Sequence, residues 1–307
     1  MKTVPILFSF DENMLMPAVV CLTSLLENAA ESTFYDIFIL HRPGCRLEGS
    51  ALFVLPELYR NCSITFRQVD KDFAGAYEIR GISIETYFRL VAPELIPEYD
   101  KILYSDVDVI FREDLSRFYE MDLGDCYFAG VDNGSALRPD VHVHLKEIGL
   151  DYRKGYYYAG NIVINSALMR KDGKIAEFRE LGKQSFKQQD MDILNIACNG
   201  RIKPLGPSFC LTNFLYGLIV NRREEMEAIY GKEEIEHALR YGIVHYNGPK
   251  PWTQECLNMD IWWNYYRKSP AFDERFCYEF WMNRATQLDH LPLMKRIKLV
   301  GRYFMKG

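Results

Sequence analysis

Two aspartates separated by one residue, Asp106 and Asp108, stand where a short apolar segment of the sequence ends. Residues two apart in an extended strand point to the same face, so the sequence predicts that both carboxylates share one face. Two carboxylates this close repel each other unless a cation lies between them. Oxygen ligands with open coordination positions suit Mg²⁺ or Mn²⁺ on a diphosphate, and a solvated turn at the strand end is the alternative.

His245 ends another short apolar segment and begins the motif at residues 245–252. An imidazole beside two carboxylates favours Mn²⁺ over Mg²⁺ as the bound ion. Gly248 would let the backbone approach a phosphate, and Lys250 would supply a positive charge to it. A purely structural histidine is the alternative here, and the glycine and lysine that follow it favour a metal-diphosphate site.

The elements that must position these side chains alternate between strands and helices. Short apolar segments predict strands at residues 4–10, 35–40, 64–69, 101–105, 126–131, 156–165 and 243–246, and helical periodicity predicts helices at 16–26, 47–61, 84–95 and 190–198. This alternation predicts an α/β domain with a mostly parallel sheet and helices on its faces. Ligands of such sheets bind at the carboxyl ends of the strands, where the two aspartates stand. No GxGxxG follows the first strand, so a dinucleotide-binding fingerprint is absent.

The strand pattern stops after residue 252, which predicts a main domain over 1–252 and a helical C-terminal extension over 253–307. From about Leu291 the tail interleaves basic residues with large apolar ones, as in an interfacial amphipathic helix. We expect this tail to bind an anionic membrane surface. A packed terminal helix with solvated lysines is the alternative.

The composition narrows the classes of protein to consider. The chain has 48% hydrophobic and 26% charged residues, as globular proteins do, and its net charge of −5 gives no reason to expect a nucleic-acid partner. Its eight cysteines include no CxxC pair, which argues against zinc and against a dense disulfide framework. No segment reads as a signal peptide or a membrane span, so we expect a cytoplasmic protein, peripheral on the inner face of the membrane if the tail binds there.

In order and spacing, these segments resemble the family 8 glycosyltransferases, which include bacterial lipopolysaccharide and lipooligosaccharide galactosyl- and glucosyltransferases and glycogenin. The resemblance rests on residues 8–13, 82–90, 106–108, 159–165, 190–195 and 245–252. It implies a GT-A-type, Rossmann-like nucleotide-sugar domain. It also implies a retaining enzyme that moves a hexose, galactose or glucose, from a UDP-sugar to a hydroxyl of a glycan or lipid-linked saccharide with Mn²⁺.

The resemblance also implies roles for individual residues. Mn²⁺ would be held by Asp106, Asp108 and His245. The UDP-sugar would be bound by these two aspartates and by Ser9, Asp11, Asn13, Arg89, Val107, Gly248 and Lys250. Among the catalytic residues, Asp190 would accept hydrogen bonds from sugar hydroxyls, and Asp132 stands where the family often places a contact to the donor or the acceptor. Asp11 and Asn13 are expected at the uracil and ribose, with Ser9 lining that pocket, and Arg89 at the donor sugar. A helix-face arginine and a helix N-cap are the alternatives for Arg89 and Asp190.

The chain departs from its relatives at two positions near the expected donor sugar. Met191 stands where many relatives have glutamine between two aspartates, and Tyr158 stands where they often have asparagine. A thioether offers neither a carboxylate nor an amide oxygen, so Met191 cannot form a covalent glycosyl intermediate. We therefore expect a front-face mechanism, in which the leaving phosphate oxygen helps to deprotonate the acceptor.

Two other classes of function use the same residues. A metal-dependent hydrolase or nucleotidyltransferase would use the carboxylates but would give Asp11 and Asn13 no special role. A catalytically idle sugar-binding protein on the same scaffold would have no need for the intact set of Asp106, Asp108, His245 and Lys250.

Overall fold

A computed structural model describes residues 1–47, 49–70, 72–78 and 83–304 of the chain. Ile82, which begins one of the motifs above, and residues 305–307 of the tail lie outside this range. Within it, the central sheet has seven strands in the order β3-β2-β1-β4-β7-β6-β8. These strands are β1 (Lys2–Ser9), β2 (Thr33–His41), β3 (Cys62–Gln68), β4 (Ile102–Ser105), β6 (Phe128–Asp132), β7 (Tyr157–Ile164) and β8 (Ile202–Leu205). All neighbouring pairs are parallel except those that β7 makes with β4 and β6, which confirms a mostly parallel α/β sheet.

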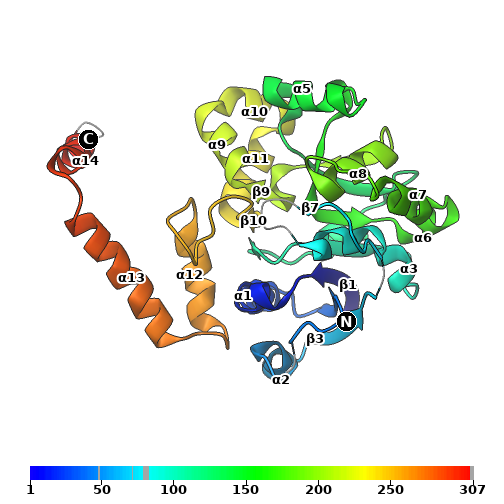
Figure 1. Cartoon of the computed structure of the whole chain (residues 1–307), viewed down its shortest axis with the longest axis horizontal. Helices are drawn as coiled ribbons and strands as arrows, with labels where there is room; N and C mark the ends of the chain where they lie inside the picture. Colours follow the sequence, from blue (N-terminus) through cyan, green and yellow to red (C-terminus); the bar gives the residue numbers. More distant parts are fainter. Residues whose placement is uncertain (48, 71, 79–82, 305–307) are drawn as a thin grey trace.

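Both faces of the sheet are covered, as the continuous apolar segments predict. Alternate residues of β1 enter different cores: Ile6 and Phe8 pack on the side of α1 (Leu15–Glu27), and Leu7 packs on the other side. The further α-helices are α2 (Leu55–Leu58), α3 (Ala92–Leu95), α4 (Ser116–Glu120), α5 (Pro139–Glu147), α6 (Ser166–Lys171), α7 (Lys174–Leu181), α8 (Gln189–Ala197), α9 (Asn213–Asn221), α10 (Arg223–Tyr230), α11 (Lys232–Tyr241), α12 (Met259–Lys268), α13 (Glu274–Asp289) and α14 (Leu293–Phe304). Figure 1 shows α6, α7 and α8, which follow β7, grouped beside this sheet, and they pack in the same core as Leu7.

Two of the predicted helices are shorter and tighter than expected. The segment 84–95 divides into a 3₁₀ helix, η3 (Ile84–Leu90), and the single turn of α3, whose Pro93 lacks the N–H that a continuous helix would use. The described part of the segment 47–61, which leaves out residue 48, forms only η2 (Ala51–Val54) and α2. Other 3₁₀ helices are η1 (Glu12–Met14), η4 (Ser135–Leu137), η5 (Tyr152–Lys154) and η6 (Pro207–Phe209).

A second, small sheet joins distant parts of the chain. It consists of β5 (Val109–Ile110), β10 (Val244–His245) and β9 (Leu211–Thr212), and it pairs His245 with Val109. The chain leaves the central sheet at Ser105 and enters the small one at Val109. The expectation that Asp106 and Asp108 lie in one extended strand is therefore wrong, because both residues belong to the crossing between two sheets.

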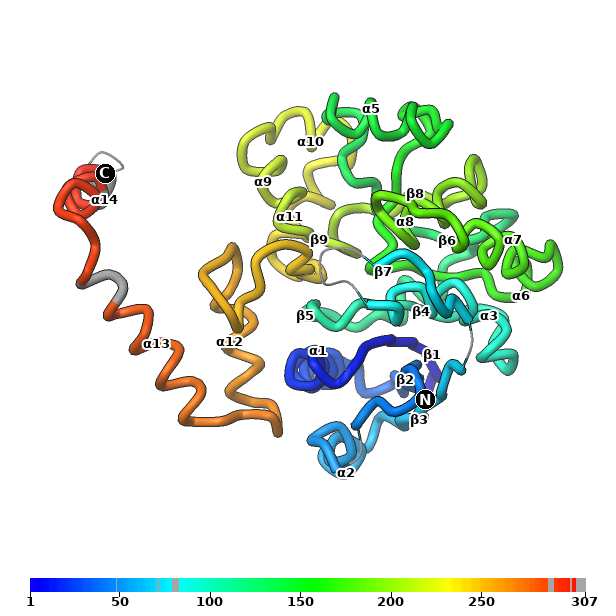
Figure 2. Tube along the Cα trace, viewed as in Figure 1, coloured from blue at the N-terminus to red at the C-terminus, as the bar shows by residue number. Residues whose placement is uncertain are grey.

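The C-terminal helices differ in how they pack. Trp262, Trp263 and Tyr266 of α12 are buried with Val20 of α1 and Ile110 of β5, so α12 is part of the main body. Phe276 and Phe280 of α13 contact the ring of Trp263, so α13 packs on α12. Figures 1 and 2 show α14 beyond α13, away from the main body. Leu293, Met294, Ile297 and Val300 of α14 are exposed and recur at helical spacing, as expected for the amphipathic tail. Among the described residues, no helix combines the length and the apolar character that a membrane crossing requires.

Candidate metal and donor site

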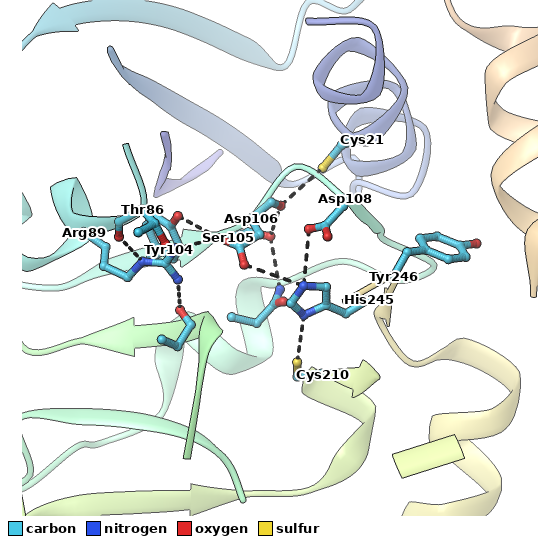
Figure 3. Close-up of polar contacts among 12 residues, drawn as sticks. Cys21, Thr86, Arg89, Tyr104, Ser105, Asp106, Asp108, Cys210, His245 and Tyr246 are labelled. Atoms are coloured by element: carbon cyan, nitrogen blue, oxygen red, sulfur yellow. Dashed lines mark hydrogen bonds and ion pairs between the residues drawn. The ribbon is translucent and has the colours of Figure 1, made fainter. Parts of the chain in front are cut away.

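Asp106, Asp108 and His245 come together although the histidine stands 139 and 137 positions after the two aspartates in the sequence. The Nε2 atom of His245 lies 3.6 Å from Asp106 Oδ2 and 3.3 Å from Asp108 Oδ1, as Figure 3 shows. One potential ligand atom from each residue lies within 4.8 Å of the others. Ligands that share an ion at about 2.1 Å lie within roughly 4 Å of one another, so a small inward movement would complete the set. Two oxygens and one imidazole nitrogen fit Mn²⁺ or Mg²⁺.

Two cationic side chains lie beside these carboxylates. Lys250 forms an ion pair with Asp108 and donates a hydrogen bond to the carbonyl of Tyr246 at 2.7 Å. Burial opposes ionisation of Asp108, but the charges of His245 and Lys250 outweigh it and hold the pKa of Asp108 well below its usual range. Burial likewise opposes charging of His245, and the carboxylate of Asp108 more than offsets it, so the pKa of His245 is raised. A metal ion would replace both positive charges.

Two residues that the sequence reasoning missed hold His245 in place. The Sγ atom of Cys210 lies 3.4 Å from Nδ1 of the imidazole, on the side opposite the aspartates (Figure 3). Gly160 of β7 lies so close that a Cβ there would be 2.3 Å from His245 Cε1 and 2.6 Å from Asp106 Oδ2. A glycine inside an apolar strand often marks such a close approach, so Gly160 carried a signal. The sequence gives no comparable signal for Cys210.

Arg89 connects the metal ligands to the predicted donor-sugar region. Its Nη2 donates to Asp106 Oδ1 at 2.8 Å and its Nε lies 3.1 Å from Asp190 Oδ2. The side chain is 4% exposed and its guanidinium lies over the ring of Tyr104 at 4.1 Å. The alternative of a solvated helix-face arginine is therefore wrong. Burial would lower the pKa of Arg89, but the carboxylates of Asp106 and Asp190 outweigh it and raise it.

Asp190 is buried beside Arg89 and is not a helix cap. Thr86 Oγ1 donates to its Oδ1 at 3.1 Å, and its Oδ2 has no hydrogen-bond partner in the described part of the chain. Burial raises the pKa of Asp190 to about 6, although Arg89 opposes the shift. The N-cap of α8 is Gln188, whose backbone N–H donates to Asp192 at 2.8 Å. Asp190 is thus free of a capping role and keeps an oxygen for another donor.

Met191 and Asp132 lie in different surroundings from the metal ligands. Met191 is partly buried and packs against apolar side chains of the core. Asp132 accepts hydrogen bonds from Ser135 N at 2.7 Å, Ser135 Oγ at 2.9 Å and Tyr156 N at 2.7 Å. It also lines a cavity of about 750 Å³ together with Tyr152 and Tyr230. A direct contact between Asp132 and a sugar remains a prediction.

The predicted nucleoside residues follow the end of β1, next to the end of β4. Ser9 Oγ lies 3.1 Å from the hydroxyl of Tyr104, which itself donates to Asp106 Oδ1 at 2.8 Å. Asp11 is 7% exposed and accepts bonds from the backbone and side-chain nitrogens of Asn13, at 3.0 and 3.1 Å. Asp11 therefore caps η1, two residues after the end of β1, and β1 pairs with β4, the strand that precedes Asp106.

The remaining predicted donor contacts surround the triad in different ways. The side chain of Val107 is buried. Gly248 is exposed, and a Cβ there would meet only Asn213 Nδ2, at 3.9 Å. An open backbone three residues after His245 is consistent with the predicted phosphate contact.

Comparisons with known proteins agree with this geometry. The family model named glycosyl transferase family 8 matches residues 5–256. A putative glycosyltransferase of Haemophilus influenzae is 25% identical over 84% of this chain and 76% of its own length. The lipopolysaccharide 1,2-glucosyltransferase of Escherichia coli K12 is 26% identical over 59% of this chain and 52% of its own. The galactosyltransferase LgtC, solved with donor and acceptor sugar analogues, superposes with a TM-score of 0.73 at 26% identity, over 89% of this chain and 99% of its own.

The matched segment runs from within β1 through β10 and includes Asp106, Asp108 and His245, so the family assignment and the site concern the same part of the chain. The fold is the GT-A type of these relatives, with the helical extension placed after it. The chain belongs to glycosyl transferase family 8.

Proposed function

We propose that this glycosyltransferase moves a hexose, galactose or glucose, from a UDP-sugar to a hydroxyl of a glycan or lipid-linked saccharide, with retention of configuration. The observation that carries the proposal is the convergence of Asp106, Asp108 and His245, with Lys250 beside them, at the carboxyl end of β4. A galactosyltransferase with sugar analogues and a lipopolysaccharide glucosyltransferase among the relatives support the substrate class.

Asp106, Asp108 and His245 would hold Mn²⁺. Mg²⁺ could take the same place, but an imidazole suits Mn²⁺ better as a ligand. When bound, the ion would supply Lewis-acid stabilisation of the charge that develops on the departing diphosphate. Lys250 would leave Asp108 and pair with a phosphate oxygen, because the ion would take over the neutralisation of the carboxylate. Gly248 would let the neighbouring backbone approach the same phosphate.

Arg89 and Asp190 would orient the transferred sugar. Oδ2 of Asp190 has no hydrogen bond among the described residues and would accept one from a sugar hydroxyl, while Arg89, 3.1 Å away, holds that carboxylate near Asp106. The acceptor oxygen would bond to the anomeric carbon on the face that the phosphate oxygen leaves, and that oxygen would take the acceptor proton. Met191 offers no nucleophile for an alternative double displacement.

The exposed apolar stripe of α14 supports a place on a membrane surface. Lys295, Arg296 and Lys298 lie between its apolar residues in the sequence and are exposed. Such a helix would lie in the interface of an anionic leaflet, so we place the protein in the cytoplasm, peripheral on the inner face of the membrane. Lipid-linked acceptors are found at that surface.

A panel of nucleotide sugars tests the proposal, scored by release of UDP with an acceptor glycan, with and without Mn²⁺. We expect release from UDP-galactose or UDP-glucose that needs Mn²⁺ and is abolished by Asp108→Ala. Acceptor-independent hydrolysis as the main reaction would favour a hydrolase, and binding without turnover would favour a sugar-binding protein. Either result contradicts the proposed transfer.

A further inference from the structure

Glu85 is a buried carboxylate without hydrogen bonds, one turn before Arg89 on η3. The residue is 1% exposed, and neither carboxylate oxygen has a hydrogen-bond partner among the residues that the structure describes. Buried polar groups are paired in nearly all cases, because an unpaired one destabilises the free protein. Glu85 is therefore poised for a hydrogen-bond donor that comes from outside the chain.

Arg42 bridges Glu85 to the predicted nucleoside site. It directly follows β2; its Nε lies 3.4 Å from Glu85 Oε1 and its Nη2 lies 3.6 Å from Asp11 Oδ2. The side chain is 40% exposed, and its guanidinium makes these two ion contacts, both longer than 3.3 Å. Arg42 thus covers the buried carboxylate while its N–H donors stay available to a ligand.

The order of the strands puts this pair at the base end of a bound nucleotide. β4, which precedes Asp106, lies next to β1, which precedes Asp11. β1 in turn lies next to β2, which precedes Arg42. A nucleoside diphosphate with its phosphates at Asp106 and its nucleoside at Asp11 therefore extends toward Arg42 and Glu85.

We propose that Glu85 and Arg42 read the base of the donor nucleotide, an inference that rests on the proposed use of a UDP-sugar. The edge of uracil presents one N–H between two carbonyl oxygens. The carboxylate accepts this N–H, and the guanidinium donates to a neighbouring carbonyl. Cytosine presents a bare ring nitrogen and an amino group there, so a lone pair would face Glu85 and an N–H donor would face Arg42. The pair selects uracil over cytosine.

Calorimetric titration with UDP, CDP and N3-methyl-UDP in the presence of Mn²⁺ tests this assignment. We expect wild type to bind UDP at least about tenfold more tightly than the other two ligands, because each breaks a charge-assisted hydrogen bond. Glu85→Gln should weaken UDP binding and bring the UDP and CDP affinities together, since an amide can also donate to cytosine. Glu57→Gln, on the exposed surface of α2, is the matched control and should bind as wild type does.

Thermal unfolding separates recognition from a structural role. Glu85→Gln removes a buried charge that has no hydrogen bond and only a 3.4 Å ion contact with the half-exposed Arg42, so the unfolding midpoint should equal or exceed that of wild type while UDP affinity falls. Binding of UDP and N3-methyl-UDP by Glu85→Gln as by wild type would overturn the inference. So would a lower midpoint with equal losses for all three ligands, which would make Glu85 structural. If wild type bound no nucleoside diphosphate, the proposed function itself would fail.

Discussion

The substitution Gly160→Ala is predicted to disrupt the metal site from the neighbouring strand. An added Cβ would lie 2.3 Å from His245 Cε1 and 2.6 Å from Asp106 Oδ2. Carbon atoms in contact stay about 3.5 Å apart, so the imidazole or the strand must move by about 1.2 Å. His245 is 4% exposed and has Cys210 behind it, so the ring has little room to retreat. The displacement therefore acts on two of the three predicted ligands at once.

Misplaced or poorly supported ligands cost about 10–100-fold in metal affinity, which is the loss we expect for Gly160→Ala. The assay is calorimetric titration of Mn²⁺ in the presence of UDP, with thermal unfolding to verify the fold. Gly130→Ala in β6 is the matched control, because the atoms nearest to its added Cβ lie at 3.4 Å. If Gly160→Ala bound Mn²⁺ as tightly as Gly130→Ala, the reasoning about the site would be refuted.

Three further predictions concern the surroundings of the site. Burial raises the pKa of Asp190 from 3.8 to about 6, so the stability that its protonation provides is present below pH 4 and is lost as the pH rises through 6. Asp190→Asn should remove this pH dependence and raise the free energy of unfolding at pH 8 by up to about 3 kcal/mol. Urea unfolding at several pH values measures both effects. His144 Nε2 donates to the fully buried Asp192 at 2.8 Å. His144→Phe should therefore lower unfolding free energy by about 2–3 kcal/mol in the same assay, and an unchanged value would contradict that role. Removal of the chain from Leu291 onward should reduce co-sedimentation with anionic vesicles without changing UDP release, and unchanged sedimentation would leave the tail a solvated helix.

Much of the central sheet could be predicted because its strands are short apolar segments buried on both faces. The antiparallel direction of β7 could not be predicted, since an apolar segment such as 157–164 has the same sequence pattern in a parallel and in an antiparallel strand. The prediction of one continuous helix at 84–95 was also wrong, because the segment is divided before Pro93 and its first part, η3, is a 3₁₀ helix. Periodicity identifies a helical segment but does not fix where it breaks.

The site was predictable where its residues lie in local motifs. Asp106, Asp108, His245 and Lys250 stand at the ends of apolar segments, and the structure brings them together. The reason given for the two aspartates was wrong, because a crossing between sheets, and not strand alternation, directs them to His245. The contacts of Cys210 depend on residues far apart in the sequence, which no local pattern encodes.

We propose that Asp106, Asp108 and His245 together hold a divalent ion on the diphosphate of a UDP-sugar. The most direct measurement is anomalous diffraction at a manganese-sensitive wavelength from crystals grown with Mn²⁺ and UDP. We predict one anomalous peak within about 2.3 Å of a ligand atom of each of the three residues, with both phosphates beside it. Bound UDP with no peak there, or with the ion held by other residues, would contradict the account.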